Sequence, residues 1–158
     1  MDLERTTAER YLRHSLTQML EVADRLGDAR VNERPLGPET NAVAALIIHC
    51  CGVTEFWLGH VGLGRPNERD RESEFSATAT VAELHALVET TIARLGEDLD
   101  RIMGGAAPDT NRAGRLFLLG GDESDGSLVL HLITELFQHL GHAELAADAL
   151  IGRNRAGS

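Results

Sequence analysis

The sequence predicts an all-α fold, a four-helix bundle with a long connection before the last helix. Four segments repeat apolar residues at steps of three and four, the spacing that places them on one face of a helix. No segment shows the strict alternation of apolar and polar residues that is typical of a half-buried strand. All 4 prolines fall between the four segments. Helices that each carry an apolar stripe bury it against one another, which is the arrangement of a bundle.

Size and charge limit what the protein can be. A chain of 158 residues, 42% of them hydrophobic, is long enough for one core, and we expect residues 1–158 to form a single domain. The net charge of -10 argues against nucleic acid and anionic membrane as partners. All 15 basic residues are arginine, which excludes a Schiff base on lysine and a P-loop lysine.

The N-terminal residues, the lengths of the apolar runs and the two cysteines predict a cytoplasmic, soluble protein. The first residues, Met1 to Glu4, are acidic and lack the basic start and apolar core of a signal peptide. We find no apolar run of the roughly 18 residues that would span a bilayer. Cys50 and Cys51 are neighbours within a predicted helix, where they fill the core; they form neither a disulfide framework nor a CxxC motif.

The first two helices lie in the first third of the chain. Thr6 and Glu9 fit a capping box that starts a helix ending near Gly27. The second helix begins at Thr40 or Asn41 and runs to about residue 59. It is apolar almost all the way round, so we expect it to be the most buried element. His49 lies on its apolar face, where a lone histidine is more often a hydrogen-bonded core residue than a metal ligand.

The chain after residue 60 has two helices and two long connections. Residues 62–76 are polar and predict a mobile surface loop. Thr80 and Glu83 form a second capping box, and the helix they start runs through residue 102.

Residues 104–126 form the long connection before the last helix, and its apolar patch 116–119 suggests a packed loop that covers the mouth of a site. The last helix begins at Asp125 or Ser127 and ends near Gly152. The connection lengths allow either an up-down order of helices or a crossover.

The last helix carries four ionisable groups on one stripe: His131, Glu135, His139 and His142. If this stripe faces water, it is a solvated surface. If it faces the interior, the glutamate and histidines are costly to leave unpaired, and a metal ion would satisfy them.

Two of these residues have the spacing of metal ligands. Glu135 and His139 are four residues apart and project from one face, as helical metal ligands do, and His49 can supply a third ligand from across the core. Two histidines and a carboxylate leave a coordination position open, which is typical of catalytic zinc or non-haem iron. A buried, hydrogen-bonded polar cluster without metal is the alternative.

The other side of the last helix is also apolar. Leu130, Ile133, Phe137, Leu140 and Ile151 lie roughly opposite Glu135 and His139. Monomers seldom expose such a patch, so we expect it to be buried in a homodimer.

Two motifs carry a family resemblance. The stretch His49-Cys-Cys-Gly-Val-Thr-Glu-Phe-Trp57, followed by Glu135-x-x-x-His139-x-Gly141-His142-Ala, resembles the DinB/YfiT-like superfamily. The nearest branch is largely actinobacterial and related to the N-terminal domain of mycothiol-dependent maleylpyruvate isomerase. The resemblance implies a DinB-like four-helix bundle, often dimeric, that binds a divalent ion, commonly zinc or nickel.

The resemblance also implies roles for individual residues. His49, Glu135 and His139 would be the metal ligands, and His142 would orient a ligand, bind substrate or substitute for a ligand. The chain departs from the family pattern at Glu144 and Ala147, where the family has aspartate and arginine, so the roles of those two positions are not carried over.

The function implied is that of a metal-dependent thiol S-transferase. A low-molecular-weight thiol such as mycothiol would be the co-substrate, activated by zinc for attack on an electrophilic small molecule, with His142 or a water moving the proton. Nickel and iron are the alternative metals. The alternative functions are a non-catalytic metal-binding or stress-related bundle and a non-haem iron oxygenase.

Overall fold

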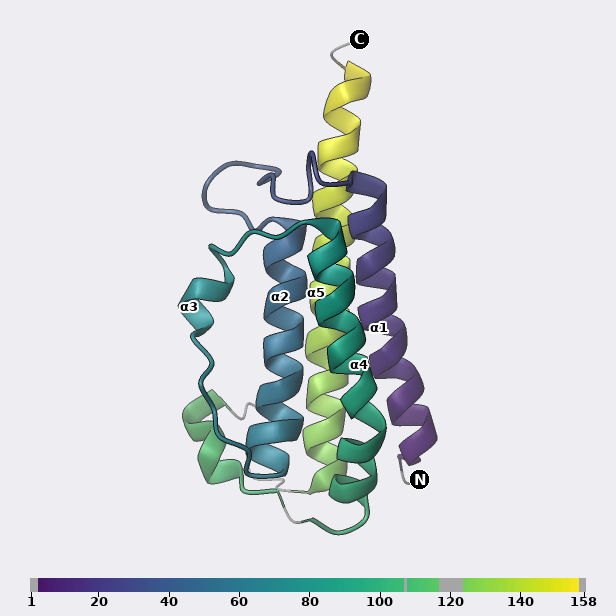
Figure 1. Ribbon diagram of the computed structural model, residues 1–158, viewed down its shortest axis with the longest axis vertical. Coiled ribbons are helices and arrows are strands. Elements are labelled where there is room, and N and C mark those ends of the chain that lie inside the picture. The colour runs from purple at the N-terminus through teal and green to yellow at the C-terminus, as the bar shows by residue number, and fades with distance from the viewer. Residues whose placement is uncertain (1–2, 107, 117–123, 157–158) are drawn as a thin grey trace.

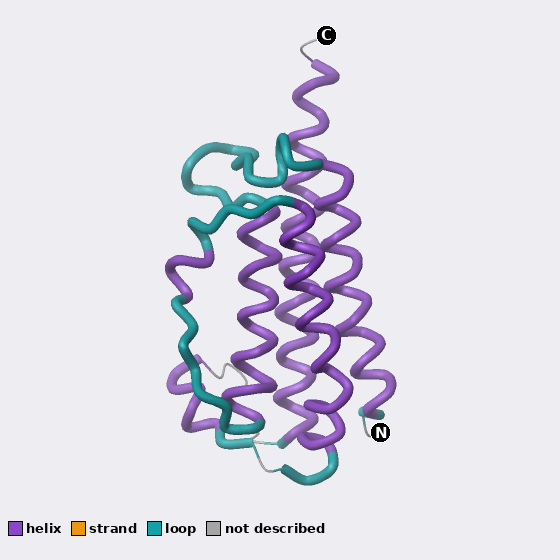
Figure 2. Tube along the Cα trace, viewed as in Figure 1, coloured by secondary structure: helices purple, strands orange, loops and turns teal. Residues whose placement is uncertain are grey.

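The computed structural model describes residues 3–106, 108–116 and 124–156, and four long helices dominate it (Figure 1). Two short helical segments lie in the connections, and the described residues contain no strand (Figure 2). The helical elements in chain order are α1 (Arg5–Leu26), α2 (Val43–Thr54), the π-helix η1 (Glu55–Gly62), α3 (Arg71–Glu74), α4 (Val81–Met103), the 3-10 segment η2 (Thr110–Leu116) and α5 (Asp125–Ala156). The predicted all-α bundle is confirmed.

The helices are connected by a crossover rather than in simple up-down order. In Figure 1, α1 and α5 run from the bottom of the bundle to the top, whereas α2 and α4 both run from top to bottom. Both α1 and α2 pack against α4 and α5. Because α2 and α4 are parallel, the chain between them must return along the whole length of the bundle. Residues 63–80 make this return, and we call them the strap.

Of the two predicted capping boxes, one is confirmed and one is wrong. At α4, the Thr80 hydroxyl oxygen accepts from the Glu83 backbone N–H and the Glu83 carboxylate accepts from the Thr80 N–H, so the capping box is confirmed. The box predicted at Thr6 and Glu9 is wrong, because α1 begins at Arg5 and its N-cap makes no side-chain hydrogen bond. Glu9 pairs instead with Arg5 and Arg13.

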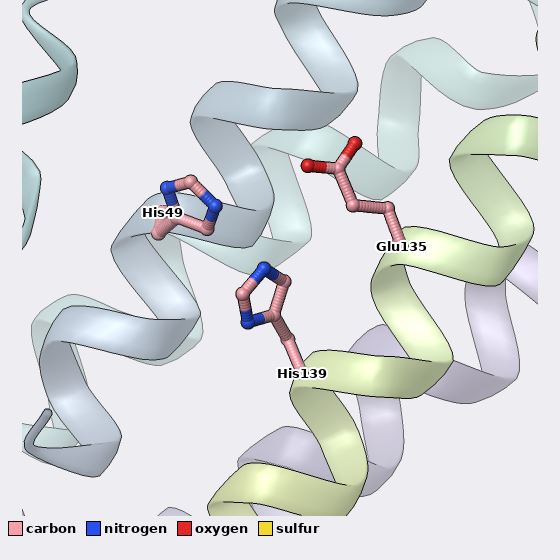
Figure 3. Close-up of side chains that lie close together, drawn as sticks. All are labelled: His49, Glu135 and His139. Carbon is pink, nitrogen blue, oxygen red and sulfur yellow. The ribbon is translucent and has the colours of Figure 1, made fainter. Parts of the chain in front are cut away.

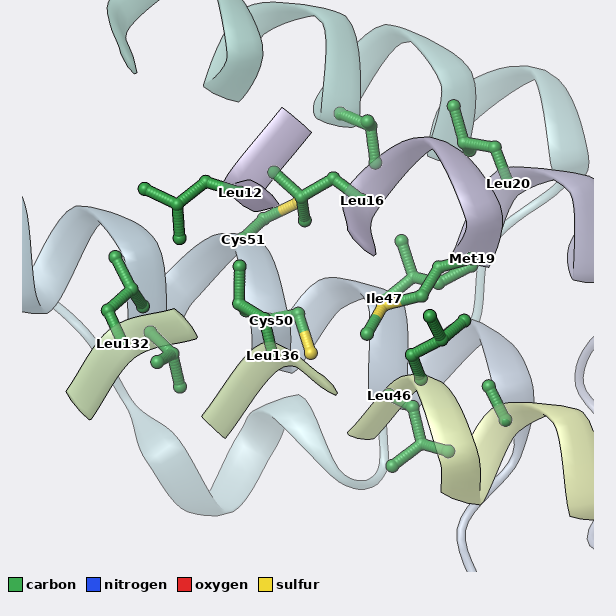
Figure 4. Close-up of a cluster of buried hydrophobic side chains, with 14 of the residues drawn as sticks. Leu12, Leu16, Met19, Leu20, Leu46, Ile47, Cys50, Cys51, Leu132 and Leu136 are labelled. Carbon is green, nitrogen blue, oxygen red and sulfur yellow. The ribbon is translucent and has the colours of Figure 1, made fainter. Parts of the chain in front are cut away.

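The core lies between α1, α2 and α5 with α4 closing it (Figure 4). Leu12, Leu16 and Ile47 are completely or almost completely buried. Cys50 and Cys51 are free, buried thiols, as predicted. Burial raises the pKa of Cys50 well above its usual value and that of Cys51 to about 11, so neither thiol is a nucleophile at neutral pH.

The second helix is longer than predicted, since α2 continues without a break through η1 to Gly62. Contrary to the expectation from the sequence, Val43–Gly62 is long and apolar enough to cross a membrane by length and composition. Within the bundle, however, 78% of its most apolar stretch is buried. The apolar surface is therefore used for packing, as in the core helix of a soluble protein.

Two further predictions differ from the structure, and a third falls largely outside the described residues. The 62–76 segment is not simply a surface loop, because it contains α3 and its Glu74 is only 8% exposed. Helix α5 continues to Ala156, past the predicted end. Of the predicted patch 116–119, residues 117–119 lie outside the described residues, so its role as a cover stays a prediction.

The apolar face predicted for dimerisation is partly covered by the chain itself. Leu140 is buried, and the Phe137 ring packs 6.0 Å from Tyr11 and 6.3 Å from His14, measured between ring centroids. Leu130 remains 53% exposed. If this face is the dimer interface, light scattering will give twice the 17.1 kDa chain mass, and Leu130→Glu will halve it. A monomeric mass for the unmodified protein would refute the prediction.

Candidate metal centre

The structure brings His49, Glu135 and His139 together. One nitrogen or oxygen atom from each side chain lies within 4.8 Å of the other two. Figure 3 shows the three side chains converging between α2, which carries His49, and α5, which carries the other two. In a tetrahedral zinc site with bonds of about 2.1 Å, the bound atoms are about 3.4 Å apart. The three donor atoms are therefore near the separation that one ion requires, and they would have to move somewhat closer together to bind it.

The strap contacts His49 at the ring nitrogen that faces away from Glu135 and His139. Its Nδ1 lies 2.8 Å from Glu74 Oε2, and the imidazole is 1% exposed. The Phe75 ring lies 4.6 Å from the imidazole, measured between centroids. Figure 3 shows the other ring nitrogen of His49 directed toward Glu135 and His139. The imidazole is thus fixed with one nitrogen on the strap and the other facing the centre.

Glu135 is held by two aromatic side chains. The Trp57 indole Nε1–H donates to Glu135 Oε2 at 3.0 Å, and His131 Nε2 lies 3.5 Å from the same oxygen. Trp57 belongs to η1 and is 3% exposed, and its ring packs edge-on against that of His131. Buried indoles usually require an acceptor for their N–H, so this contact orients the carboxylate and satisfies the indole at once.

His139 is electrically neutral at physiological pH. Burial, and then the neighbouring His49, lower its pKa from the ordinary 6.5 to about 4. Its buried Nδ1 has no hydrogen-bond partner among the described residues. A neutral imidazole has the free electron pair that a metal requires, so this histidine needs no deprotonation to bind an ion at neutral pH.

The lowered pKa predicts how the metal-free protein responds to acid. Below pH 6.5 an unfolded chain protonates His139 while the folded chain does not, so the free energy of unfolding falls until about pH 4, where both are protonated. The loss amounts to roughly 3 kcal/mol. Urea unfolding at several pH values in this window should show His139→Gln losing less stability than wild type. Identical pH profiles would contradict the assignment.

His142 lies beside the three residues rather than among them. Its ring is exposed and its centroid is 5.7 Å from that of His139. It lines one side of a groove of about 320 Å³ whose walls include Leu36, Leu46 and Leu145. The predicted role of His142 as an orienting residue or proton carrier therefore remains a prediction, with a position that suits it.

A larger cavity lies elsewhere. Its volume is about 640 Å³, and it is bounded by the strap, α2 and α4. Arg69 and Glu74 line it, but the described lining residues do not include His49, Glu135 or His139. We therefore place the chemistry at the convergence of the three side chains rather than in this cavity.

Comparison with known protein families decides the classification, because a model of the DinB superfamily matches residues 11–143. The chain belongs to the DinB superfamily. Searches of curated proteins and of solved structures found no match. Like many DinB proteins, this one carries a set of residues suited to a divalent ion. Its closer relation to the actinobacterial branch and to the mycothiol-dependent isomerase stays a prediction.

One of the two departures from the family pattern has a structural explanation in this DinB protein. Ala147 is completely buried in the core, so its position in α5 serves packing, whereas Glu144 is exposed.

Sequence reasoning missed the residues that support the ligands. Glu74 and Arg69 fall in a polar run that has no helical period, and Trp57 ends a motif that assigns it no role. A signal for Trp57 exists in hindsight, since an indole within an otherwise apolar helix needs an acceptor. We find no comparable signal for Glu74, whose burial depends on the path of the strap.

Proposed function

We propose that this DinB protein is a divalent-metal-dependent enzyme in which His49, Glu135 and His139 hold the ion. The convergence of these three side chains supports the proposal most strongly. Two neutral imidazoles and one carboxylate form the donor set of catalytic zinc sites, in which a further coordination position stays open. Zinc is our first choice, and nickel or iron would suit the same donors.

The reaction we propose is transfer of a low-molecular-weight thiol of the mycothiol type to an electrophilic small molecule. A divalent ion in such a site lowers the pKa of a thiol that reaches it, which makes the nucleophilic thiolate available at neutral pH. The buried cysteines of the chain are too basic to be the nucleophile, so the thiol must come from a co-substrate.

The side chains around the site have separate tasks in this proposal. Glu74 keeps His49 in place, and Trp57 keeps Glu135 in place, so that both donors face the centre. His142 is exposed next to His139, where it accepts the proton that the thiol loses and returns it to the leaving group or to water.

The groove beside His142 is where we place the electrophile. Leu36 and Leu145 are 75% and 70% exposed on its walls, and none of the described residues that line it is an acid, an arginine or a lysine. In a protein with a net charge of -10, an uncharged concave surface favours a ligand with an apolar, neutral body. A polar reactive end would then point past His142 toward the ligands.

Turnover with defined thiols tests the proposal. Zinc-loaded protein is incubated with mycothiol or bacillithiol and an epoxide or chlorinated electrophile, and the thioether product is measured by mass spectrometry. We expect turnover that His142→Ala reduces by about 100-fold or more at unchanged zinc content. His14→Ala, an exposed histidine of α1, is the matched control and should keep the wild-type rate.

Two other experimental outcomes would favour a different function. Bound metal without turnover with any of these thiols would favour the non-catalytic metal-binding or stress-related bundle. Iron as the bound metal, together with oxygen uptake, would identify a non-haem iron oxygenase instead.

A further inference from the structure

We propose that the strap is part of the metal centre: Glu74 is a positioning residue for His49, and docking of the strap is thermodynamically linked to binding of the ion. This inference rests on the proposed metal site but not on the proposed S-transfer. It assigns a function to a segment whose sequence is typical of a surface loop.

The first support is the contact between Glu74 and His49. With Glu74 ionised, its carboxylate only accepts, so the 2.8 Å contact assigns the proton to His49 Nδ1. Arg69 Nη2 also lies 3.2 Å from Nδ1, and its shorter hydrogen bond goes to Glu74 Oε2 at 2.8 Å. The free electron pair is then on Nε2, the nitrogen that faces Glu135 and His139 (Figure 3). Metal-ligating histidines commonly donate their second N–H to a carboxylate in this way, and that contact fixes both the tautomer and the direction of the ring.

The second support is that Glu74 is itself fixed by an arginine of the strap. Arg69 donates to both carboxylate oxygens, from Nε to Oε1 at 2.6 Å and from Nη2 to Oε2 at 2.8 Å. The Arg69 guanidinium also lies over the Phe56 ring, 5.7 Å from its centroid.

The third support is that α2 makes room for this ion pair. Gly52 follows His49 by three residues, and a Cβ atom placed on it would lie 2.3 Å from Glu74 Oε1 and 3.1 Å from Arg69 Nε. Any larger residue at this position would push the pair away from the helix. Glycine costs helix stability relative to alanine, so its presence here in mid-helix is explained by the close approach of the strap.

The link between strap docking and ion binding follows from how the strap is attached to the bundle. Arg65 ties its beginning to Asp98 and Glu55, and Asn32 ties its end by accepting from the Ala79 N–H. Between these points, Glu74 anchors the strap on His49. If Nε2 held an ion, the imidazole would lose electron density and its Nδ1–H would bind Glu74 more strongly. Because such coupling is reciprocal, a change that favours the docked position of the strap must also raise the affinity for the ion.

Zinc affinity of matched variants tests the positioning role. With zinc competed against a chelating dye, Glu74→Gln should bind about 10- to 100-fold more weakly than wild type. Glu72→Gln removes an exposed carboxylate two residues earlier on the strap and should not change the affinity. Gly52→Ala should weaken binding too, although it removes no polar group and touches no proposed ligand. Circular dichroism and thermal unfolding establish that each variant is folded.

Proteolysis of the strap tests the linkage independently of affinity. Saturating zinc should slow trypsin cleavage after Arg69 and Arg71 at least several-fold in wild type, and have no such effect in Glu74→Gln. Folded Glu74→Gln and Gly52→Ala proteins with wild-type affinity, or cleavage that zinc does not slow, would overturn this inference while leaving the metal site intact. A wild-type protein that binds no zinc, nickel or iron would overturn both.

Discussion

His139→Ala and His49→Ala are each expected to lower affinity for a divalent ion by roughly 60- to 700-fold. Structural zinc sites with four ligands have apparent binding free energies of about 10–16 kcal/mol, or about 2.5–4 kcal/mol per ligand. Each 1.4 kcal/mol is about a factor of ten in affinity, so the loss of one ligand corresponds to a factor of roughly 60 to 700. Isothermal titration of the metal-free variants with zinc measures the effect.

The controls for this prediction are histidines outside the convergence. His14 is exposed on α1, and His142 is exposed beside the site, so alanine at either position should leave zinc affinity within about two-fold of wild type. His139→Ala should stay folded without metal, because it removes a buried ring nitrogen that has no partner among the described residues. His49→Ala removes a hydrogen-bond partner of the buried Glu74, so circular dichroism must first establish that this variant is folded. Wild-type affinity in folded His49→Ala or His139→Ala would exclude that residue as a ligand.

Leu132→Ala is expected to destabilise the metal-free bundle by about 2–5 kcal/mol. Leu132 is completely buried, and its truncation loses the transfer free energy of the side chain and leaves a cavity in the core. The total stability of a domain is only about 5–15 kcal/mol, so the variant should unfold at a clearly lower urea concentration.

Leu130→Ala provides the matched control, two residues away on the same helix. Leu130 is 53% exposed, so its truncation should change stability by less than about 0.5 kcal/mol in a monomer. A larger, concentration-dependent loss for Leu130→Ala would show that a second copy of the chain covers this face. Equal effects of the two substitutions at low concentration would mean that the orientation of α5 is wrong.

The four long helices were predictable because each carries its own signal. Leu84, Val88 and Leu95 repeat at helical spacing, and the structure buries all three. Such a stripe is a property of neighbouring residues and needs no knowledge of the rest of the chain. The failed capping box shows the limit of local signals, because Arg5 and Arg13, each four residues from Glu9, compete for its carboxylate.

The convergence of the three site residues was predictable for the same reason. Glu135 and His139 are one helical turn apart, so any helix presents them together. His49 was the one histidine on the apolar face of the most buried helix, and costly burial favours a polar partner nearby. The structure confirms this juxtaposition; the identity of an ion is a separate question that only binding measurements address.

The order of the helices and the role of the strap could not be predicted. Connection lengths allowed both an up-down order and a crossover, and only the crossover sends residues 63–80 past His49. Glu74 and Arg69 have the composition of a solvated segment, and they become buried because each neutralises the other beside the imidazole. Pairing between residues on separate elements leaves no periodic pattern in a single sequence.

Metal content of the protein purified without a histidine tag is the measurement that tests the metal centre most directly. Elemental analysis by mass spectrometry should find about one equivalent of a divalent ion per chain, with zinc the first expectation. The ion should be removable by a chelator and restored by zinc, nickel or iron at neutral pH, where His139 is neutral. Protein that contains no divalent ion and takes none up would show that His49, Glu135 and His139 form a polar cluster and not a metal site.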